Sequence, residues 1–227
     1  MNTLKIAGTV IKIDLCRAYD RVNWLYICML MTRLGISLDF IRWMMSCLSS
    51  MSFSILINGV ASPFFHPRRG LRQGCPLSLI LFLLVAEGLS RFLSKAKTGG
   101  SFGGIHITRD IILSQLIFVD DVLIFCDGLR RDTDCLVVGL ELFKKVTRMI
   151  INVGNSNLVS HLVPVEDILY LNNQLPFLSL DFEAGIKYLG FHLKPNEYQK
   201  VDWQWLIGNW KNRFHFRAIG GYHRLVG

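Results

Sequence analysis

Charge and proline are both scarce in this sequence, and their scarcity excludes several classes of protein. Only 19% of the 227 residues are charged and 6 are proline, whereas 51% are hydrophobic. A chain with this composition has too much apolar surface to remain intrinsically disordered, and it contains no low-complexity repeat. Its length fits one large domain or two small ones. We therefore expect a globular protein with a sizeable core.

Long apolar segments and closely spaced cysteines are also lacking. The most apolar run, Leu77 to Ala86, is too short to cross a membrane. The segment from Met1 to Ile13 contains two lysines and no signal-peptide core. The six cysteines include no C-x-x-C pair, so a zinc site is not indicated. We expect an intracellular protein with reduced, buried thiols and no membrane partner.

Acidic residues are few and unevenly distributed. The net charge is +8, from 25 basic and 17 acidic residues. Residues 1–100 carry a net charge of +8, residues 101–187 of −4, and residues 188–227 of +4. Two basic flanks around an acidic centre fit a protein that binds a polyanion and holds metal ions in its middle. The same distribution also fits an ordinary solvated surface, so both interpretations stay open at this point.

The apolar pattern predicts a mixture of hairpins and helices, which is typical of the α+β class. Residues 10–15 predict a strand with Lys12 and Asp14 on one face and aliphatic side chains on the other. Asn58-Gly59 predicts the turn of a hairpin over 53–64, and Pro76 predicts the start of a helix that ends near residue 95. The other predicted elements are helices at 24–34, 38–48 and 133–148, strands at 105–107, 114–118 and 122–125, short strands and turns over 149–195, and a helical, aromatic tail from about 202.

Three aspartates stand at the ends of apolar strands, where stability alone gives no reason for them. Asp120 and Asp121 lie side by side between two such strands, and Asp14 lies on the polar face of another. Like charges this close repel each other unless a cation compensates, and hard divalent cations prefer oxygen ligands. Three carboxylates on neighbouring strands can hold two Mg²⁺ ions about 3.5–4 Å apart for phosphoryl transfer. Asp20 is a further candidate, although an N-cap of the following helix is its simpler interpretation.

Four segments, taken in order, resemble the motifs of a known family. Residues 11–24, IKIDLCRAYDRVNW, are similar to motif A of reverse transcriptases from LINE-type (non-LTR) retrotransposons, especially plant ones. Residues 69–78, RGLRQGCPLS, resemble motif B, residues 118–121, FVDD, resemble motif C, and residues 188–190, YLG, resemble the turn after motif D. The resemblance implies a polymerase palm, an antiparallel sheet with packed helices, over residues 1–197 with its fingers largely missing. Residues 198–227 would begin a helical thumb.

The resemblance also implies a role for each matching residue. Asp14, Asp120 and Asp121 would be the catalytic carboxylates and would bind two Mg²⁺ ions, with Mn²⁺ as an alternative. The nucleotide-binding residues would be Leu15, Cys16, Ala18, Tyr19, Gln73 and Gly74, with Tyr19 excluding a 2′-hydroxyl. Nucleic acid would be bound by Arg68, Arg69, Arg72, Lys211 and Arg213. The implied partners are an RNA template, a DNA primer and deoxynucleoside triphosphates, with no obligate protein partner, and the implied location is the nucleus, although no targeting signal is seen.

The sequence departs from the family pattern around these motifs. Cys75 stands where Asp is usual, Leu79 where Pro is usual and Val119 where Ala is usual, and Ile150 and Asn155 occupy places where lysines are expected. A missing lysine there would remove an acid for the pyrophosphate leaving group. We therefore expect an RNA-directed DNA polymerase fragment that is weak or inactive alone.

Two other functions fit the same residues. A non-catalytic, nucleic-acid-binding remnant of a retroelement would keep the basic residues without chemistry. Another two-metal enzyme, such as a nuclease, would share the carboxylates but would not need Tyr19, Gln73 and Gly74 in this arrangement. The three basic residues 68, 69 and 72 also fit a solvated loop, and the aromatic tail also fits a buried helix face.

Overall fold

The computed structural model describes residues 7–195, 198–204, 206–208 and 210. It divides into two compact units, Met1–Asp181 and Phe182–Gly227, which are described separately. These units are not functional subdomains, so the boundary between palm and thumb at residue 197 stays a prediction.

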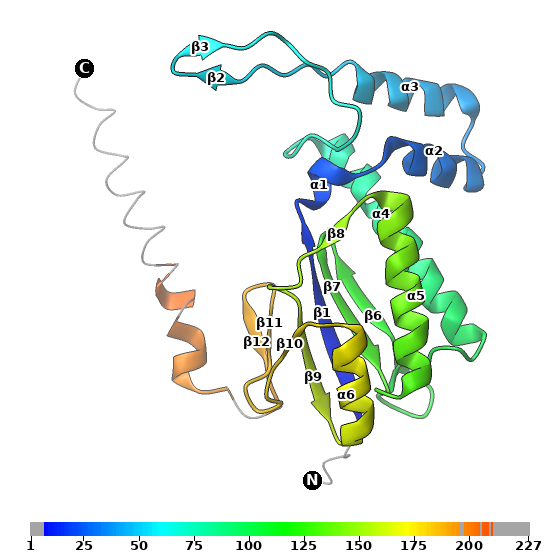
Figure 1. Ribbon diagram of the computed structural model, residues 1–227, viewed down its shortest axis with the longest axis vertical. Coiled ribbons are helices and arrows are strands. Elements are labelled where there is room, and N and C mark those ends of the chain that lie inside the picture. The colour runs from blue at the N-terminus through cyan, green and yellow to red at the C-terminus, as the bar shows by residue number, and fades with distance from the viewer. Residues whose placement is uncertain (1–6, 196–197, 205, 209, 211–227) are drawn as a thin grey trace. The chain divides into compact units, whose positions relative to one another are not determined.

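A six-stranded sheet forms the centre of the first unit (Figure 1). Its main path has the order β10-β9-β1-β7-β6, and β8 pairs with the end of β1. All of these pairings are antiparallel except that of β10 with β9. The strands are β1 (Gly8–Cys16), β6 (Gln115–Phe118), β7 (Asp121–Cys126), β8 (Ile150–Ile151), β9 (Asn157–His161) and β10 (Leu178–Ser179). This confirms the predicted α+β, antiparallel, palm-like sheet.

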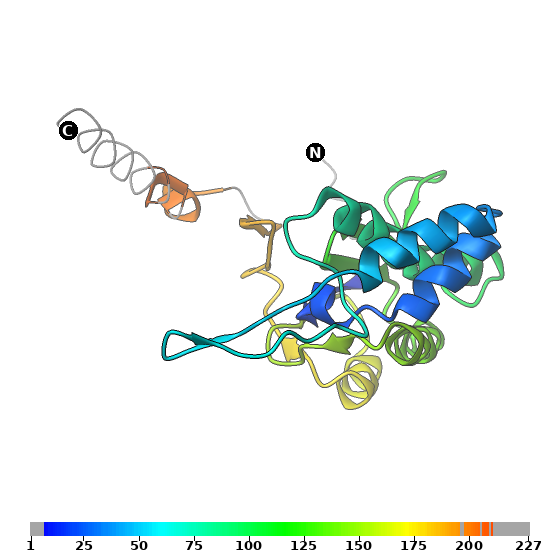
Figure 2. The ribbon, with the colours of Figure 1, turned by 90° about the horizontal axis from the view of Figure 1, so that it is seen from above.

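Helices cover the apolar face of this sheet. Helix α4 packs against α2 and α5, α5 packs against α6, and α2 and α3 run side by side (Figures 1 and 2). The helices of the unit are α1 (Ala18–Arg21), α2 (Trp24–Arg33), α3 (Leu38–Ser49), α4 (Pro76–Thr98), α5 (Arg130–Thr147) and α6 (Val165–Gln174). Their positions match the predicted helices except for α1 and α6, which were not predicted.

The segment 149–195 was expected to form only short strands and turns, and this expectation is wrong for α6. Pro164 precedes the helix, and Glu166 and Asp167 lie in its first turn, where acidic side chains favour helix formation. Leu171 is the single fully buried residue of the ten, so no apolar period was strong enough to reveal the helix.

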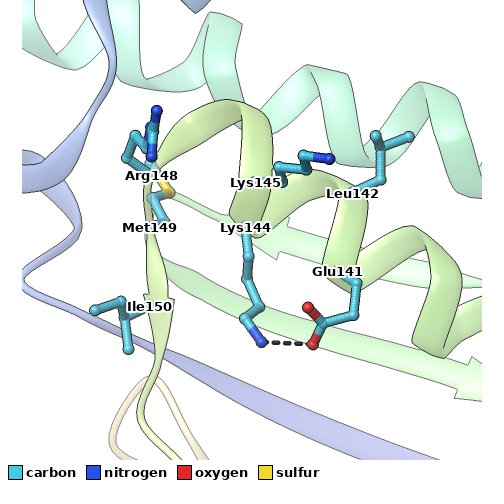
Figure 3. Close-up of a pocket in the computed structure, with 7 residues that line it drawn as sticks. All are labelled: Glu141, Leu142, Lys144, Lys145, Arg148, Met149 and Ile150. Carbon is cyan, nitrogen blue, oxygen red and sulfur yellow. Dashed lines mark hydrogen bonds and ion pairs between the residues drawn. The ribbon is translucent and has the colours of Figure 1, made fainter.

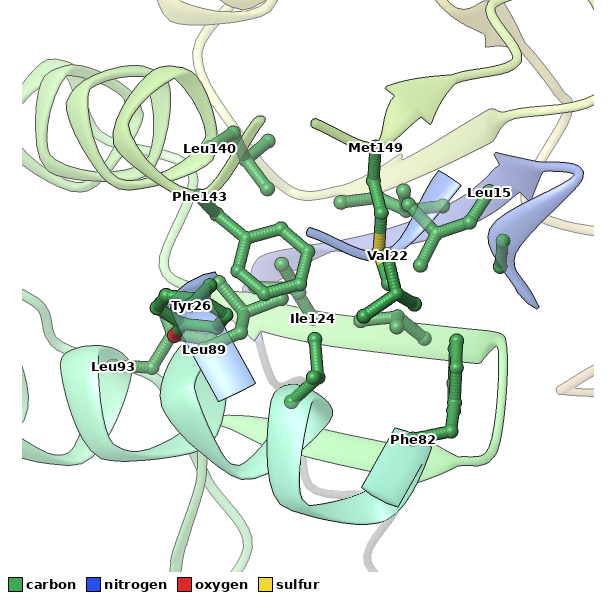
Figure 4. Close-up of a cluster of buried hydrophobic side chains, with 14 of the residues drawn as sticks. Leu15, Val22, Tyr26, Phe82, Leu89, Leu93, Ile124, Leu140, Phe143 and Met149 are labelled. Carbon is green, nitrogen blue, oxygen red and sulfur yellow. The ribbon is translucent and has the colours of Figure 1, made fainter. Parts of the chain in front are cut away.

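The core lies between the sheet and the helices (Figure 4). Strand β1 alternates as predicted, with Ile11 and Ile13 at 0% and 1% exposure and Lys12 and Asp14 half-buried on the opposite face. A single cluster joins the inward side chains of β1 and β7 to those of α2, α4 and α5, among them Tyr26, Phe82, Leu89, Ile124, Leu140 and Phe143. The polar face of β1 therefore points away from the helices.

Helix α4 is long and apolar enough to cross a membrane by length and composition, and it is the one such helix among the described residues. Its Leu81, Phe82 and Val85 side chains are almost completely buried in the cluster just described. A core helix packed on a sheet has this same composition, so α4 carries no separate indication of a membrane.

Three short hairpins complete the described elements. Strands β2 (Leu56–Ile57) and β3 (Val60–Ala61) flank Asn58-Gly59, whose positive φ values of 50° and 83° fit the predicted tight turn. Strands β4 (Ile105–His106) and β5 (Ile112–Leu113) form the second hairpin. In the second unit, β11 (Ile186–Tyr188) pairs with β12 (Phe191–Leu193), the 3₁₀ helix η1 covers Lys200–Trp203, and residues 204, 206–208 and 210 are helical.

The six cysteines are free, as expected from their spacing. The expectation that they are buried holds for Cys126 but is wrong for Cys47, which is exposed. Helix α3 buries only Ile41 and Leu48, so its other face, including Cys47, remains accessible.

The contact between α4 and α5 depends on the absence of a side chain at Gly139. A Cβ atom there would lie 2.1 Å from the Cε1 atom of Phe92 and 2.7 Å from its Cδ1 atom. We expect Gly139→Ala to lower the free energy of unfolding by about 1–3 kcal/mol, because overpacking outweighs the better helix propensity of alanine. Urea denaturation measures the change. Val138→Ala, at an exposed position of α5, is the control and should change it by less than about 0.5 kcal/mol. An unchanged or higher value for Gly139→Ala would contradict this packing.

Candidate active site

The turn between β6 and β7 presents the adjacent aspartates. Phe118 pairs with Asp121, so Val119 and Asp120 form a two-residue loop. Val119 has a φ of 56° and Asp120 does not have a positive φ, which fits a type II′ turn. Glycine is usual at the first position of that turn, and a β-branched residue there is strained. The turn therefore holds Asp120 in an exposed position at an energetic cost.

Asp14 lies directly opposite Asp121 in the antiparallel pairing of β1 with β7. Cross-strand neighbours on one face of such a pair have Cβ atoms about 4.5–5.5 Å apart. Their side chains lie on the face opposite Ile13 and Val122, which are buried against the helices. The register thus brings Asp14 and Asp121 together, with Asp120 next to them in the turn.

The three carboxylates influence one another electrostatically. Partial burial raises the pKa of Asp121, the positive charge of Lys12 opposes this shift, and the charges of Asp120 and Asp14 add to it. Negative charges held this close favour the arrival of a cation.

The donor atoms fit a hard divalent cation, although the side chains do not form a closed cluster. Over the described ranges of the chain, no three His, Cys, Asp or Glu side chains gather in a way that could hold a metal ion. Mg²⁺ is usually bound by one or two carboxylates together with water and substrate phosphates, so it does not require such a cluster. Carboxylates on two adjacent strands therefore match the chemistry of Mg²⁺.

Asp20 does not belong to this group and does not cap the following helix. It is exposed within α1. The N-cap of α2 is Asn23, whose side chain accepts a hydrogen bond from the Leu25 N–H at 3.1 Å. The capping interpretation was wrong for Asp20 because the chain turns once more, as α1, before α2 begins.

Tyr19 connects the aspartates to the helices. Its ring stacks on Phe82 with the ring centroids 4.5 Å apart and the planes 12° apart. Burial raises the pKa of the Tyr19 hydroxyl, and the charge of Asp120 raises it further, so the two groups lie within electrostatic reach. Leu15 and Ala18 are buried and Cys16 is half-buried. A ligand beside Tyr19 would therefore contact the backbone of residues 15–18 rather than the buried side chains of Leu15 and Ala18.

The loop that contains the predicted nucleotide-contacting residues is attached to the same segment. The Leu71 N–H donates to the Tyr19 carbonyl at 2.7 Å, and the indole of Trp24 donates to the Gly70 carbonyl at 2.6 Å. A Cβ atom on Gly70 would lie 2.7 Å from the Asp20 carbonyl oxygen, and its φ of 88° also favours glycine. Tyr19 therefore lies between this loop and Asp120.

Gln73 and Gly74 follow in the loop before α4, and both are exposed, as are the three arginines. Cys75 is the N-cap of α4 but makes no capping hydrogen bond through its side chain. The backbone N–H groups of Ser78 and Leu77 nevertheless lower the pKa of its thiol, with a smaller contribution from Arg72. The structure thus places Gln73, Gly74 and the basic residues 68, 69 and 72 on one exposed loop. Lys211 and Arg213 lie outside the described residues.

Two groups near the aspartates were missed by the sequence analysis. The amides of Asn152 and Asn155 both donate to the Asp14 carboxylate, at 2.9 and 3.3 Å. Asn155 had been noted only as a replacement for lysine. The polar turn INVGNSN, between two short strands, is the local signal, but its contact with Asp14 depends on pairing across 138 residues.

A pocket opens at the end of α5 and the start of β8 (Figure 3). Its lining includes Lys144, Lys145 and Arg148, and Lys144 forms an ion pair with Glu141. Cations in the last turn of a helix stabilise it through the helix dipole, which explains these residues without a ligand. Ile150, which also lines the pocket, pairs with Cys16, so the pocket adjoins the C-terminal end of β1.

The raised pKa of Asp121 makes stability depend on pH. The folded state binds the Asp121 proton more tightly than the unfolded chain does, so stability falls as pH rises through the interval between the two pKa values. We expect Asp121→Asn to raise the midpoint of thermal unfolding at pH 7 without metal. The difference should shrink as pH falls through the raised pKa of Asp121 and should disappear below 3.8, the ordinary value. Asp110→Asn, at an exposed position, should not change the midpoint. A lower midpoint for Asp121→Asn at pH 7 would contradict the electrostatics.

Known proteins are similar in sequence to parts of this chain. The Pol polyprotein of the type-1 retrotransposable element R2 of Popillia japonica is 30% identical over 125 residues, which cover 55% of this chain and 19% of that protein. The Pol polyprotein of the type-2 element R2DM of Drosophila melanogaster is 29% identical over 141 residues, or 59% and 13%. An uncharacterized mitochondrial protein of Arabidopsis thaliana is 40% identical over 67 residues, or 29% and 55%. The chain thus spans less than a fifth of the length of the two R2 relatives.

Solved structures of telomerase from Candida tropicalis have a similar fold. The apo enzyme, truncated from its C-terminal domain, matches with a TM-score of 0.53 and 17% identity over 72% of this chain and 32% of that chain. The complex with a fragment of telomeric RNA matches with a TM-score of 0.56 and 15% identity, over 85% and 29%. The family model described as reverse transcriptase (RNA-dependent DNA polymerase) matches residues 1–193. The chain therefore belongs to the reverse transcriptase family, and its R2 relatives confirm the LINE-type resemblance of its motifs.

Proposed function

We propose that this chain provides the catalytic palm for RNA-templated DNA synthesis. In this reaction a primer 3′-hydroxyl attacks the α-phosphate of a deoxynucleoside triphosphate, a new phosphodiester bond forms and pyrophosphate leaves. The observation that carries the proposal is the register that sets Asp14 opposite Asp121, with Asp120 in the adjoining turn. Membership of the reverse transcriptase family supports the same reaction.

The three aspartates would hold the metal ions that this reaction needs. Two Mg²⁺ ions, when bound, would lower the pKa of the attacking hydroxyl and stabilise the charge on the leaving oxygen. Asp14 and Asp121 offer carboxylates from rigid neighbouring strands, and Asp120 offers one from the turn. Burial raises the pKa of Asp121, and the charges of Asp120 and Asp14 raise it further; bound cations would relieve that repulsion.

Tyr19 and the loop before α4 would orient the nucleotide. The stack of Tyr19 on Phe82 fixes the ring beside Asp120, where it would exclude a ribose 2′-hydroxyl. The exposed Gln73 can donate and accept hydrogen bonds, and Gly74 has open space where a Cβ atom would stand. Both would contact the nucleotide and template, while the buried Leu15 and Ala18 would contribute backbone alone.

The departures from the family pattern would slow this reaction. Val119 places a strained, β-branched residue beside Asp120. Asn155 holds Asp14 by an amide where the family has a lysine, so it supplies no acid for the leaving pyrophosphate. We therefore propose that extension is slow.

Primer extension on an RNA template tests the proposal. With Mg²⁺ or Mn²⁺, the wild-type chain should extend an annealed DNA primer, and Asp120→Asn should abolish extension because a metal-binding carboxylate becomes a neutral amide. Asp110→Asn, an exposed carboxylate of the β4–β5 hairpin loop, should leave extension unchanged. Extension equal in the wild type and Asp120→Asn would overturn the assignment. Binding without extension would favour the non-catalytic alternative, and cleavage without nucleotides would favour a nuclease.

The exposed arginines should contribute phosphate contacts, which can be measured separately from catalysis. We expect Arg72→Ala to weaken binding of an RNA–DNA duplex equally for unrelated sequences, and to reduce the slope of log affinity against log salt concentration by about one. Fluorescence anisotropy over a salt series measures both quantities. Arg91→Ala is the control, because Arg91 forms an ion pair with Glu87 along the body of α4. An unchanged slope in Arg72→Ala would identify this loop as solvated surface.

A further inference from the structure

One turn holds both the backbone and the side chain of Asp14. It covers residues 152–156, between β8 and β9. Strand β8 pairs with Leu15 and Cys16, and β9 pairs with β1 from Gly8 to Lys12. The five residues of the turn therefore lie opposite only Ile13 and Asp14, so the regular ladder is interrupted at the aspartate.

The turn replaces the lost ladder bonds at Asp14. The Asp14 N–H donates to the Ser156 hydroxyl at 3.1 Å, and the Asn152 N–H donates to the Asp14 carbonyl at 2.8 Å. Ser156 is completely buried and its hydroxyl donates to the Asn152 carbonyl at 2.8 Å. The N–H groups of Asn155 and Ser156 also donate to that carbonyl, at 3.2 and 2.9 Å. The turn is thus cross-linked internally and fixed to β1.

The two amides act on one oxygen of the carboxylate. The Nδ2 atoms of Asn152 and Asn155 lie 2.9 and 3.3 Å from Oδ2 of Asp14. Within the part of the chain that the structure describes, Oδ1 receives no such bond. Amide donors fix the orientation of a carboxylate while leaving its full negative charge, whereas a lysine would neutralise part of that charge.

We propose that Asn152 and Asn155 are positioning residues that hold Asp14 through Oδ2 and keep Oδ1 available to a divalent cation. This inference rests on the proposed function, because it assigns a supporting role to residues around a proposed metal ligand. Carboxylates that bind metals are commonly held by hydrogen bonds from a second layer of residues, and loss of such partners costs about 10–100-fold in metal affinity or activity. Ser156 fixes the turn that carries the two amides.

Direct metal titration tests this role without relying on activity. Mn²⁺ binding to the full chain is followed by the loss of the free-ion signal in electron paramagnetic resonance. We expect the double variant Asn152→Ala/Asn155→Ala to bind Mn²⁺ about 10–100-fold more weakly than the wild type, and each single variant to show a smaller loss. Asn173→Ala, an exposed asparagine of α6, is the matched control and should bind like the wild type. Circular dichroism and the unfolding midpoint establish that each variant is folded.

Two further variants separate this inference from the function on which it rests. Asp14→Asn and Asp120→Asn should lose Mn²⁺ binding, and wild-type binding in both would overturn the metal site itself. If they lose binding while the double asparagine variant binds like the wild type, the positioning role fails and the metal site stands. Tighter binding in the double variant would also overturn the role, because the amides would then compete with the cation. If the double variant unfolds, the two single variants carry the test, because each keeps one amide donor to Oδ2 of Asp14; wild-type Mn²⁺ binding in both would overturn the role.

Discussion

The antiparallel register between β1 and β7 is the constraint on which the candidate site depends. Asp14 faces Asp121 because Ile13 faces Val122. A slip of one residue would exchange the two faces, burying Asp14 against the helices and exposing Ile13. Burial of Ile11 and Ile13, which are 0% and 1% exposed, resists that slip. The hydrophobic core therefore fixes the positions of charged groups that it does not contain.

Tyr19 links the aspartates to the rest of the site. Its ring is fixed by Phe82 on α4, burial and then the charge of Asp120 raise the pKa of its hydroxyl, and its carbonyl accepts a hydrogen bond from the loop residue Leu71. The loop is fixed a second time where the Trp24 indole binds the Gly70 carbonyl. Segments far apart in sequence thus meet around one residue of a four-residue helix. A change in the packing of α4 would therefore shift the positions of both the loop before α4 and the aspartates.

Local patterns predicted the elements of the fold but not the contacts between them. The alternation of β1, the turn at Asn58-Gly59 and the helix start at Pro76 follow from neighbouring residues, and the structure agrees with them. Helix α6 was missed because Leu171 is its one fully buried residue. The aspartates could be identified as a group because each ends an apolar strand. The bonds from Asn152 and Asn155 to Asp14 could not be foreseen, because they depend on where β8 stops and β9 begins.

Two unfavourable features meet at the same end of the sheet. Val119 adopts a backbone conformation that suits glycine. Partial burial raises the pKa of Asp121, and the charges of Asp120 and Asp14 add to that shift. Neither feature improves packing, and each lowers stability in isolation. Exceptions to local rules concentrate at functional sites, where other parts of the fold compensate for them. Here the compensation comes from the buried strands beneath the aspartates and from the turn that satisfies the backbone of Asp14. Together these contacts hold the three aspartates at the same end of β1 and β7 despite their like charges.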